Sequence, residues 1–129
     1  MIKYFIIFTA FGIFGAVIDT LYRFIKSKKY TSGTRFGFFS PIYAIGATIL
    51  AIEFKFIEIN PIFQIFIAGV SLTFLELLSG IFCVRIMKKR YWNYSKNKWN
   101  YKGHIDALHS FYWILLALLF RIIFPSILD

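Results

Sequence analysis

Long apolar stretches alternate with short basic ones along this chain. Four stretches of about 20 predominantly apolar residues, the length that a helix needs to cross the hydrocarbon core of a bilayer, cover residues 4–25, 36–56, 61–87 and 106–128. No segment has the turn-rich alternation that is typical of a membrane barrel. The pattern therefore predicts an all-α membrane protein, a four-helix transmembrane bundle in which residues 1–129 form one domain.

The composition supports this prediction. Hydrophobic residues make up 59% of the chain and charged residues 16%, whereas soluble chains carry about 25% charged residues. A water-soluble fold of 129 residues could not bury so much apolar surface. We therefore expect a multi-pass integral protein of the cell membrane.

The net charge of +9 would suggest nucleic acid as a partner in a soluble protein. Here, however, twelve of the fifteen basic residues lie in or beside two segments between the apolar stretches. The twelve are Arg23, Lys26, Lys28, Lys29, Arg35, Arg85, Lys88, Lys89, Arg90, Lys96, Lys98 and Lys102, and the other three are Lys3, Lys55 and Arg121. The positive-inside rule then predicts that residues 26–35 and 88–105 are cytoplasmic loops and that both termini are outside. Anionic lipid headgroups, and no nucleic acid, are the expected partners of these charges.

The second basic segment, KKRYWNYSKNKWNYKGHIDALH (residues 88–109), also carries five Tyr and Trp side chains. Such rings suit the headgroup layer, so the segment is either an interfacial anchor or, in addition, the cover of a binding site. It resembles the first basic segment, since RFIKSKKY (23–30) is similar to RIMKKRY (85–91). The two halves are either a parallel repeat, as known in transporters, or two hairpins that obey the same charge rule.

Two acidic residues fall inside the apolar stretches. Asp19 can pair with Arg23 at i,i+4 spacing, whereas Glu76 has no basic residue within one helical turn. An ionised carboxylate at that depth is costly, so Glu76 needs a partner from another helix, water, a ligand or a proton. Our functional hypothesis is that Glu76 and Asp19 line one cytoplasmic-side cavity, with residues 91–101 as its lid. The alternative is that Glu76 is a structural carboxylate between helices.

Ser40-Pro41 has the signature of a helix N-cap followed by proline at the first helical position. We therefore expect the second helix to begin within two residues of Pro41, after a non-helical stretch that lines a cavity. An anionic group at this helix N-terminus would have Arg35 nearby. The alternative is a proline kink within a longer helix.

The segment GHIDALH places Asp106 and His109 on one helix face, next to His104. Asp106 and His109 are weak candidates for metal ligands, because the paired spacings of metal sites are missing, and an N-cap role for Asp106 is favoured. We expect no metal and no cofactor. The chain has no nucleotide-binding P-loop, hydrolase or haem motif, which makes an enzyme the less favoured class.

Four stretches, GIFGAVIDTLY, RFGFFSPIYAIG, LELLSG and RYWNYSKNKWNYKGHI, resemble the type IV ABC-transporter permease family, the CmpB-like membrane proteins, over residues 12–113. The positions that match the family pattern are Asp19, Gly37, Pro41, Ile42, Tyr43, Gly46, Glu76, Gly80, Trp92, Tyr94, Ser95, Asn100 and Gly103. Asp19 matches the pattern only as an acidic residue, because the family is expected to have glutamate there. The chain departs from the pattern at His104, where arginine is expected.

The resemblance implies a small membrane transport component. Together with the two acids of the apolar stretches, it leads to the hypothesis that the chain binds a small solute or an amphiphile in a cytoplasmic-side cavity. The candidate ligand-binding residues are Asp19, Arg23, Arg35, Pro41, Tyr43, Glu76, Trp92, Tyr94, Asn100 and His104. A separate ATPase subunit would be required, and so small a bundle is expected to work as a homodimer or in a larger complex. Two alternatives stay open: a membrane-embedded enzyme acting on a lipid-type substrate, and a structural or regulatory partner of another membrane protein.

Overall fold

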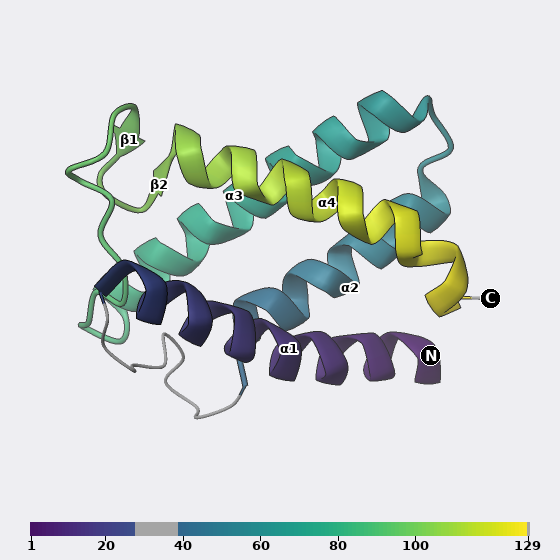
Figure 1. Ribbon diagram of the computed structural model, residues 1–129, viewed down its shortest axis with the longest axis horizontal. Coiled ribbons are helices and arrows are strands. Elements are labelled where there is room, and N and C mark those ends of the chain that lie inside the picture. The colour runs from purple at the N-terminus through teal and green to yellow at the C-terminus, as the bar shows by residue number, and fades with distance from the viewer. Residues whose placement is uncertain (28–38, 129) are drawn as a thin grey trace. The chain divides into compact units, whose positions relative to one another are not determined.

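The computed structural model of the chain describes residues 1–27 and 39–128 (Figure 1). Within these residues the helices are α1 (Ile2–Ser27), α2 (Pro41–Phe56), α3 (Pro61–Arg85) and α4 (Ala107–Leu128). Two short antiparallel strands, β1 (Asn100–Tyr101) and β2 (Ile105–Asp106), lie between α3 and α4. The chain divides into two compact units, residues 1–48 and 49–129, and the boundary falls within α2. The predicted all-α membrane fold is confirmed.

Three of these helices are long and apolar enough to cross a membrane, over Ile2–Ile25, Pro61–Arg85 and Ala107–Ser126. Helix α2 has 16 residues and spans about 24 Å at 1.5 Å per residue. It is shorter than the predicted span because it begins at Pro41, as the Ser40-Pro41 signature predicted. The Ser40 carbonyl accepts the first intrahelical hydrogen bond, from the Ala44 N–H. Residues 36–38 of the predicted span lie outside the described residues.

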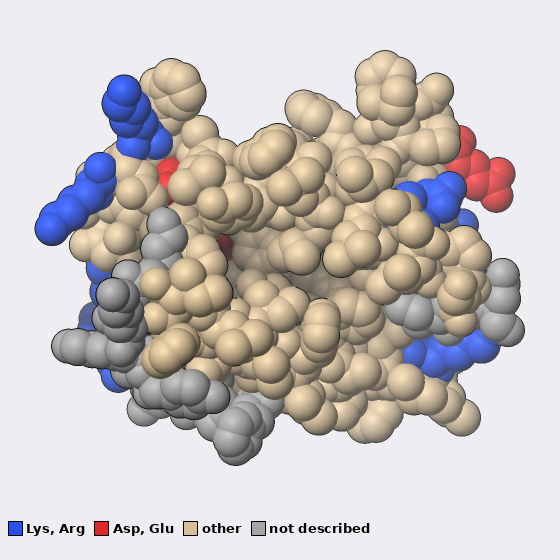
Figure 2. All heavy atoms as spheres, viewed as in Figure 1, with Lys and Arg blue, Asp and Glu red and all other residues tan. Residues whose placement is uncertain are grey.

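Helix α3 shows why these helices suit a bilayer. Along α3, every fourth residue from position 62 to position 82 is a large apolar side chain that is about half exposed or more, and these side chains form a ridge inclined to the helix axis. These residues are Ile62, Phe66, Val70, Phe74, Leu78 and Phe82. An exposed apolar ridge of this length is rare on a soluble monomer and matches lipid chains instead. In Figure 2, residues other than Lys, Arg, Asp and Glu make up most of the visible surface.

In the unit of residues 1–48, two glycines of α1 allow the start of α2 to approach closely. The Ser40 N–H donates a hydrogen bond of 2.8 Å to the Gly12 carbonyl. The Phe39 ring lies against Gly12 and the Tyr43 side chain against Gly15, so that a Cβ atom at either glycine would collide with a ring. The backbone of α1 therefore serves as the docking surface for residues 39–43.

In the unit of residues 49–129, α3 packs antiparallel to α4. The Asn60 side chain caps the start of α3 by accepting a hydrogen bond from the Ile62 N–H, and Pro61 follows it in the first turn. Further along, Gly69 leaves room for Ile114 of α4, which a Cβ atom at position 69 would displace. This packing brings the middle of α3 next to the first turns of α4, where the polar residues of the unit gather.

Candidate functional site

A carboxylate in the middle of α3 is the centre of the site. Glu76 is only 4% exposed. Its Oε1 atom accepts a hydrogen bond of 2.8 Å from the Tyr94 hydroxyl, and its Oε2 atom accepts one of 2.5 Å from the indole N–H of Trp113. Tyr94 comes from the segment between α3 and α4, residues 86–106, which we call the α3–α4 loop, and Trp113 comes from α4. In the described part of the chain no cation forms an ion pair with Glu76, so two neutral donors satisfy this buried carboxylate.

The α3–α4 loop also docks on the next turn of α3. The His104 ring lies against Gly80, and a Cβ atom at position 80 would come within 2.6 Å of the ring nitrogen Nδ1. The indole N–H of Trp92 donates to the His104 carbonyl at 2.8 Å, which fixes the backbone that carries the ring. On one turn of α3, Glu76 therefore accepts the hydrogen bond from Tyr94. On the following turn, Gly80 leaves room for the His104 ring.

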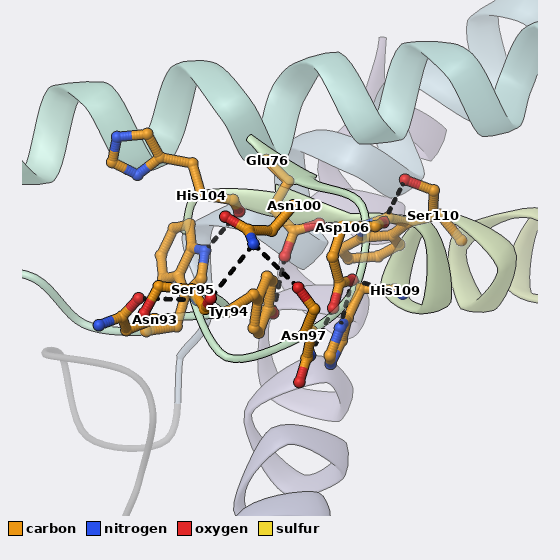
Figure 3. Close-up of polar contacts among 12 residues, drawn as sticks. Glu76, Asn93, Tyr94, Ser95, Asn97, Asn100, His104, Asp106, His109 and Ser110 are labelled. Carbon is orange, nitrogen blue, oxygen red and sulfur yellow. Dashed lines mark hydrogen bonds and ion pairs between the residues drawn. The ribbon is translucent and has the colours of Figure 1, made fainter. Parts of the chain in front are cut away.

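Side-chain amides hold the α3–α4 loop in a defined shape (Figure 3). The Asn100 side chain accepts a hydrogen bond from the Gly103 N–H and donates to the carbonyls of Ser95 and Asn97. Gly103 has a φ angle of +72°, a conformation that L side chains rarely adopt, and a Cβ atom there would meet the Asn93 side chain. The spacing of Asn100 and Gly103 thus has a physical cause. Gly103 adopts the positive φ angle of the turn, and the Asn100 side chain accepts the hydrogen bond from its N–H.

Asp106 connects this loop to α4. Its Oδ1 atom accepts a hydrogen bond of 2.8 Å from the His109 N–H, which confirms the predicted N-cap role. The same oxygen lies 2.7 Å from His109 Nδ1, and Oδ2 accepts from the Asn97 amide. The His109 ring in turn stacks on the Tyr94 ring, with centroids 3.9 Å apart and an interplanar angle of 8°. Asp106 therefore orients the imidazole that positions Tyr94 beneath Glu76.

The two metal candidates, Asp106 and His109, use their polar atoms on each other in this arrangement. Among the described residues, no group of three or more His, Cys, Asp and Glu side chains is close enough to hold a metal ion. The pair forms a hydrogen-bonded cap at the start of α4.

The burial and the charges of the loop shift two pKa values. Burial lowers the pKa of His104, and the positive charges of Arg90 and Lys102 lower it further below 6.5. For Asp106, burial alone would raise the pKa. The hydrogen bonds from Asn97 and His109 together outweigh burial, so that the pKa of Asp106 lies below its ordinary value of 3.8. His104 is thus favoured as a neutral ring and Asp106 as a carboxylate.

The structure joins Tyr94 to Glu76 among the predicted ligand-binding residues. Trp92, Asn100 and His104 shape or dock the α3–α4 loop and make no hydrogen bond to Glu76.

The remaining candidates lie in the other unit or outside the described residues. Arg23 pairs with Asp19 at 3.2 Å, which confirms the predicted i,i+4 pair. Pro41 begins α2, Tyr43 lies against Gly15, and Arg35 falls outside the described residues. Asp19 and Glu76 belong to different compact units, so the proposed common cavity stays a prediction.

Sequence reasoning missed the second donor to Glu76. Trp113 lies within an apolar stretch, where an indole N–H needs an acceptor. Glu76, in another apolar stretch, needed a donor. A donor and an acceptor that both lacked a partner in the apolar stretches were therefore the sequence signal from which this hydrogen bond could have been predicted. The stacking of His109 on Tyr94 has no comparable signature, because it depends on how the loop folds back over α4.

Comparison with known protein families identifies the chain. A model of the family described as "Putative ABC-transporter type IV" matches residues 6–129. The chain belongs to this family. It is a multi-pass integral membrane protein of the cell membrane that is related to ABC transporters. No curated protein and no solved structure matches it.

The resemblance to this type IV ABC-transporter family included several residues to which the structure gives a physical role. Glu76 and Tyr94 form the hydrogen bond between α3 and the loop. Gly80 makes room for His104, and Asn100 with Gly103 closes the turn. These residues of the pattern therefore build one feature, a loop folded onto α3 at a buried carboxylate.

The Tyr94–Glu76 bond yields a prediction about the loop. Replacing Tyr94 with Phe removes one hydrogen bond to a buried charged group, which costs about 1.5–3 kcal/mol. We expect faster hydrogen exchange of the backbone amides in residues 91–106, with little change in the first half of α3. Tyr101→Phe is the matched control, because Tyr101 lies on the same loop and is 52% exposed. Equal exchange in the two variants would contradict a docking role for Tyr94.

The lowered pKa of His104 yields a prediction about pH. As the pH falls below about 6.5, the unfolded chain binds a proton at His104 before the folded protein does. The contribution of the neutral His104 ring to the free energy of unfolding is therefore fully present above that pH. It is lost as the pH falls towards the lower pKa that His104 has in the folded state. The thermal midpoint should fall less for His104→Gln than for the wild type between about pH 7.5 and 5.5. Parallel curves for the two proteins would show that His104 is not held neutral by the fold.

Proposed function

We propose that this protein is a permease-like component that binds a small solute or an amphiphile at Glu76, in the cytoplasmic half of the membrane. The observation that carries the proposal is the pair of donors to this carboxylate. A side chain that is 4% exposed within a membrane-length helix is satisfied by one helix residue, Trp113, and by one loop residue, Tyr94. A loop is the part of a protein that can leave such a site most readily.

The chemistry of the site supports a ligand that carries a hydrogen-bond donor. If the α3–α4 loop swings away from α3, Glu76 loses the Tyr94 hydroxyl and one carboxylate oxygen becomes available. A ligand with a hydroxyl, amine or ammonium group would satisfy that oxygen, while Trp113 keeps the other. The Tyr94 hydroxyl thus occupies the place of the ligand in the closed state, and the loop acts as a lid.

The charge of the α3–α4 loop and the family of the chain support two further parts of the proposal, the orientation in the membrane and the partner subunits. The six basic residues of the α3–α4 loop between positions 88 and 102 favour the cytoplasmic side, where anionic lipids are concentrated. Kinship with ABC transporters supports a separate ATPase subunit, since this chain carries no Walker motif. A homodimer or a larger complex would form the complete pathway for the solute across the membrane, for which one chain of this size is too small.

A membrane enzyme that acts on a lipid-type substrate is the second candidate, and the Asp106–His109 pair favours it. An imidazole held by a carboxylate at 2.7 Å is the arrangement of an oriented general base. His104 is the less suitable base, because its ring is buried against Gly80. If His109→Ala abolished conversion of a lipid-type substrate but still bound the ligand, the result would favour an enzyme over a permease.

The proposal predicts a co-purifying ligand that depends on Glu76. The full chain is purified in lipid nanodiscs, and the bound small molecules and lipids are extracted and compared by mass spectrometry. Glu76→Gln keeps the size of the side chain and an acceptor for Trp113, so the protein should fold while losing a ligand that requires the carboxylate. We expect at least one species that is abundant in the wild type and several-fold depleted in Glu76→Gln.

The matched control is Glu53→Gln, which makes the same change in a carboxylate of α2 that accepts a hydrogen bond from Ser71. It should retain the ligand. Extracts that are identical for the wild type and Glu76→Gln, from equally stable proteins, would contradict the binding role and favour a structural or regulatory partner.

The proposed orientation predicts which connections are reachable from outside the cell. In a Cys83→Ala background, a cysteine at Ser95 of the α3–α4 loop should be protected from an impermeant thiol reagent in intact cells, and one at Glu58 should react. Both native positions are exposed, so accessibility of the side chain does not bias the comparison. The opposite labelling pattern would reverse the orientation and place the Glu76 site in the outer half of the membrane.

A further inference from the structure

A second polar cluster lies at the other end of the unit formed by residues 49–129. Gln64 of α3 is 5% exposed, and its amide N–H groups donate to the carbonyls of Phe54 at 3.2 Å and Ile57 at 2.9 Å. Because the amide nitrogen must face these two carbonyls, the amide oxygen is aimed the other way. That oxygen accepts a hydrogen bond of 3.0 Å from Nε of Arg121 on α4. Arg121 is therefore held through its Nε atom by a side chain whose own orientation is fixed.

The guanidinium of Arg121 is also held by an aromatic ring. Its Cζ atom lies 5.9 Å from the centroid of the Phe54 ring, within the range of a cation–π contact. Phe120 and Phe124 of α4 each pack against the same ring, with centroid distances of 6.0 Å. The ring is thus anchored, and the guanidinium has a defined direction before any ligand arrives.

In the part of the chain that the structure describes, the two terminal nitrogens of Arg121 have no hydrogen-bond acceptor. Within residues 1–27 and 39–128, Arg121 forms no ion pair, and its hydrogen bond is the one from Nε to Gln64. The terminal N–H groups of arginine form a planar fork that matches the paired oxygens of a phosphate or a carboxylate. On a helix of membrane-spanning length, a fork that meets no acceptor among the described residues is suited to an anion from outside the chain.

The position of Arg121 along α4 indicates which anion is within reach. It lies 14 residues after Ala107, the first residue of the helix, or about 21 Å along the axis from the α3–α4 loop. This level is near the far end of the span, where a long cationic side chain reaches the headgroup layer. Its neighbour Ile122 is 67% exposed and Leu118 is 41% exposed, so the surroundings suit lipid chains.

We propose that Arg121 is a binding site for the phosphate group of a phospholipid, in the leaflet opposite the α3–α4 loop. The fork would take two phosphate oxygens, and the exposed apolar residues of α4 would line the acyl chains. The site is independent of Glu76 and of the function proposed for it. Gln64 and Phe54 act as positioning residues, since they orient the guanidinium and do not contact the lipid.

Native mass spectrometry of the delipidated full chain in a neutral detergent tests this site. The probes are phosphatidylglycerol, a diacylglycerol with the same acyl chains and no phosphate, and inorganic phosphate as a competitor. We expect the wild type to bind the first phosphatidylglycerol at least about tenfold more tightly than the diacylglycerol. This comparison needs no variant, so a folding defect cannot obscure it.

Variants then assign the effect to Arg121. Arg121→Gln should remove the preference for the phosphate-bearing lipid. Arg121→Lys, which keeps the charge and loses the planar fork, should weaken it several-fold. Lys55→Gln is the control, because Lys55 is an exposed cation in the last turn of α2 and should leave the preference unchanged.

Three results would overturn the proposal. The first is equal binding of the two lipids by the wild type. The second is an equal loss in Arg121→Gln and Lys55→Gln, which would indicate a diffuse effect of charge. The third is displacement of phosphatidylglycerol by inorganic phosphate at millimolar concentration, which would make the site one for a free anion.

Discussion

A buried carboxylate in an apolar helix must find hydrogen-bond donors, and the unit of residues 49–129 is arranged around that requirement. Glu76 is only 4% exposed, and in the described part of the chain it has no cation as a partner. Its two oxygens are satisfied by Tyr94 from the loop and Trp113 from α4. Removing one donor would leave a buried charge less well compensated, which is costly. Glu76 is thus a side chain through which α3 contacts both the α3–α4 loop and α4.

Local rules explain how much of this could be predicted from the sequence. The apolar stretches predicted the helices, and Ser40-Pro41 predicted the start of α2. The preference of Asp106 for an N-cap position indicated the start of α4. Each of these depends on residues that are neighbours in the sequence. The need of Glu76 for a partner was also predictable, because an ionised carboxylate within an apolar span is costly unless it is paired or hydrogen-bonded.

The identity of the partners was not predictable, because it depends on how separate segments pack. Trp113 is 37 residues away from Glu76 in the sequence, and no periodicity connects them. Arg121 and Gln64 are 57 residues apart, and Arg121 appeared in the sequence as one more basic residue on the less charged side. The predicted cavity shared by Asp19 and Glu76 was based on depth in the membrane, which does not say which faces of two helices meet.

The central claim, that the Glu76–Tyr94 hydrogen bond ties the loop to α3, is tested most directly by a double-mutant cycle. The free energy of unfolding is measured in mixed micelles for the wild type, Glu76→Leu, Tyr94→Phe and the double variant. Our account predicts that the double variant is less destabilised than the sum of the single variants, by about 1.5–3 kcal/mol. Single effects that add without such coupling would contradict it.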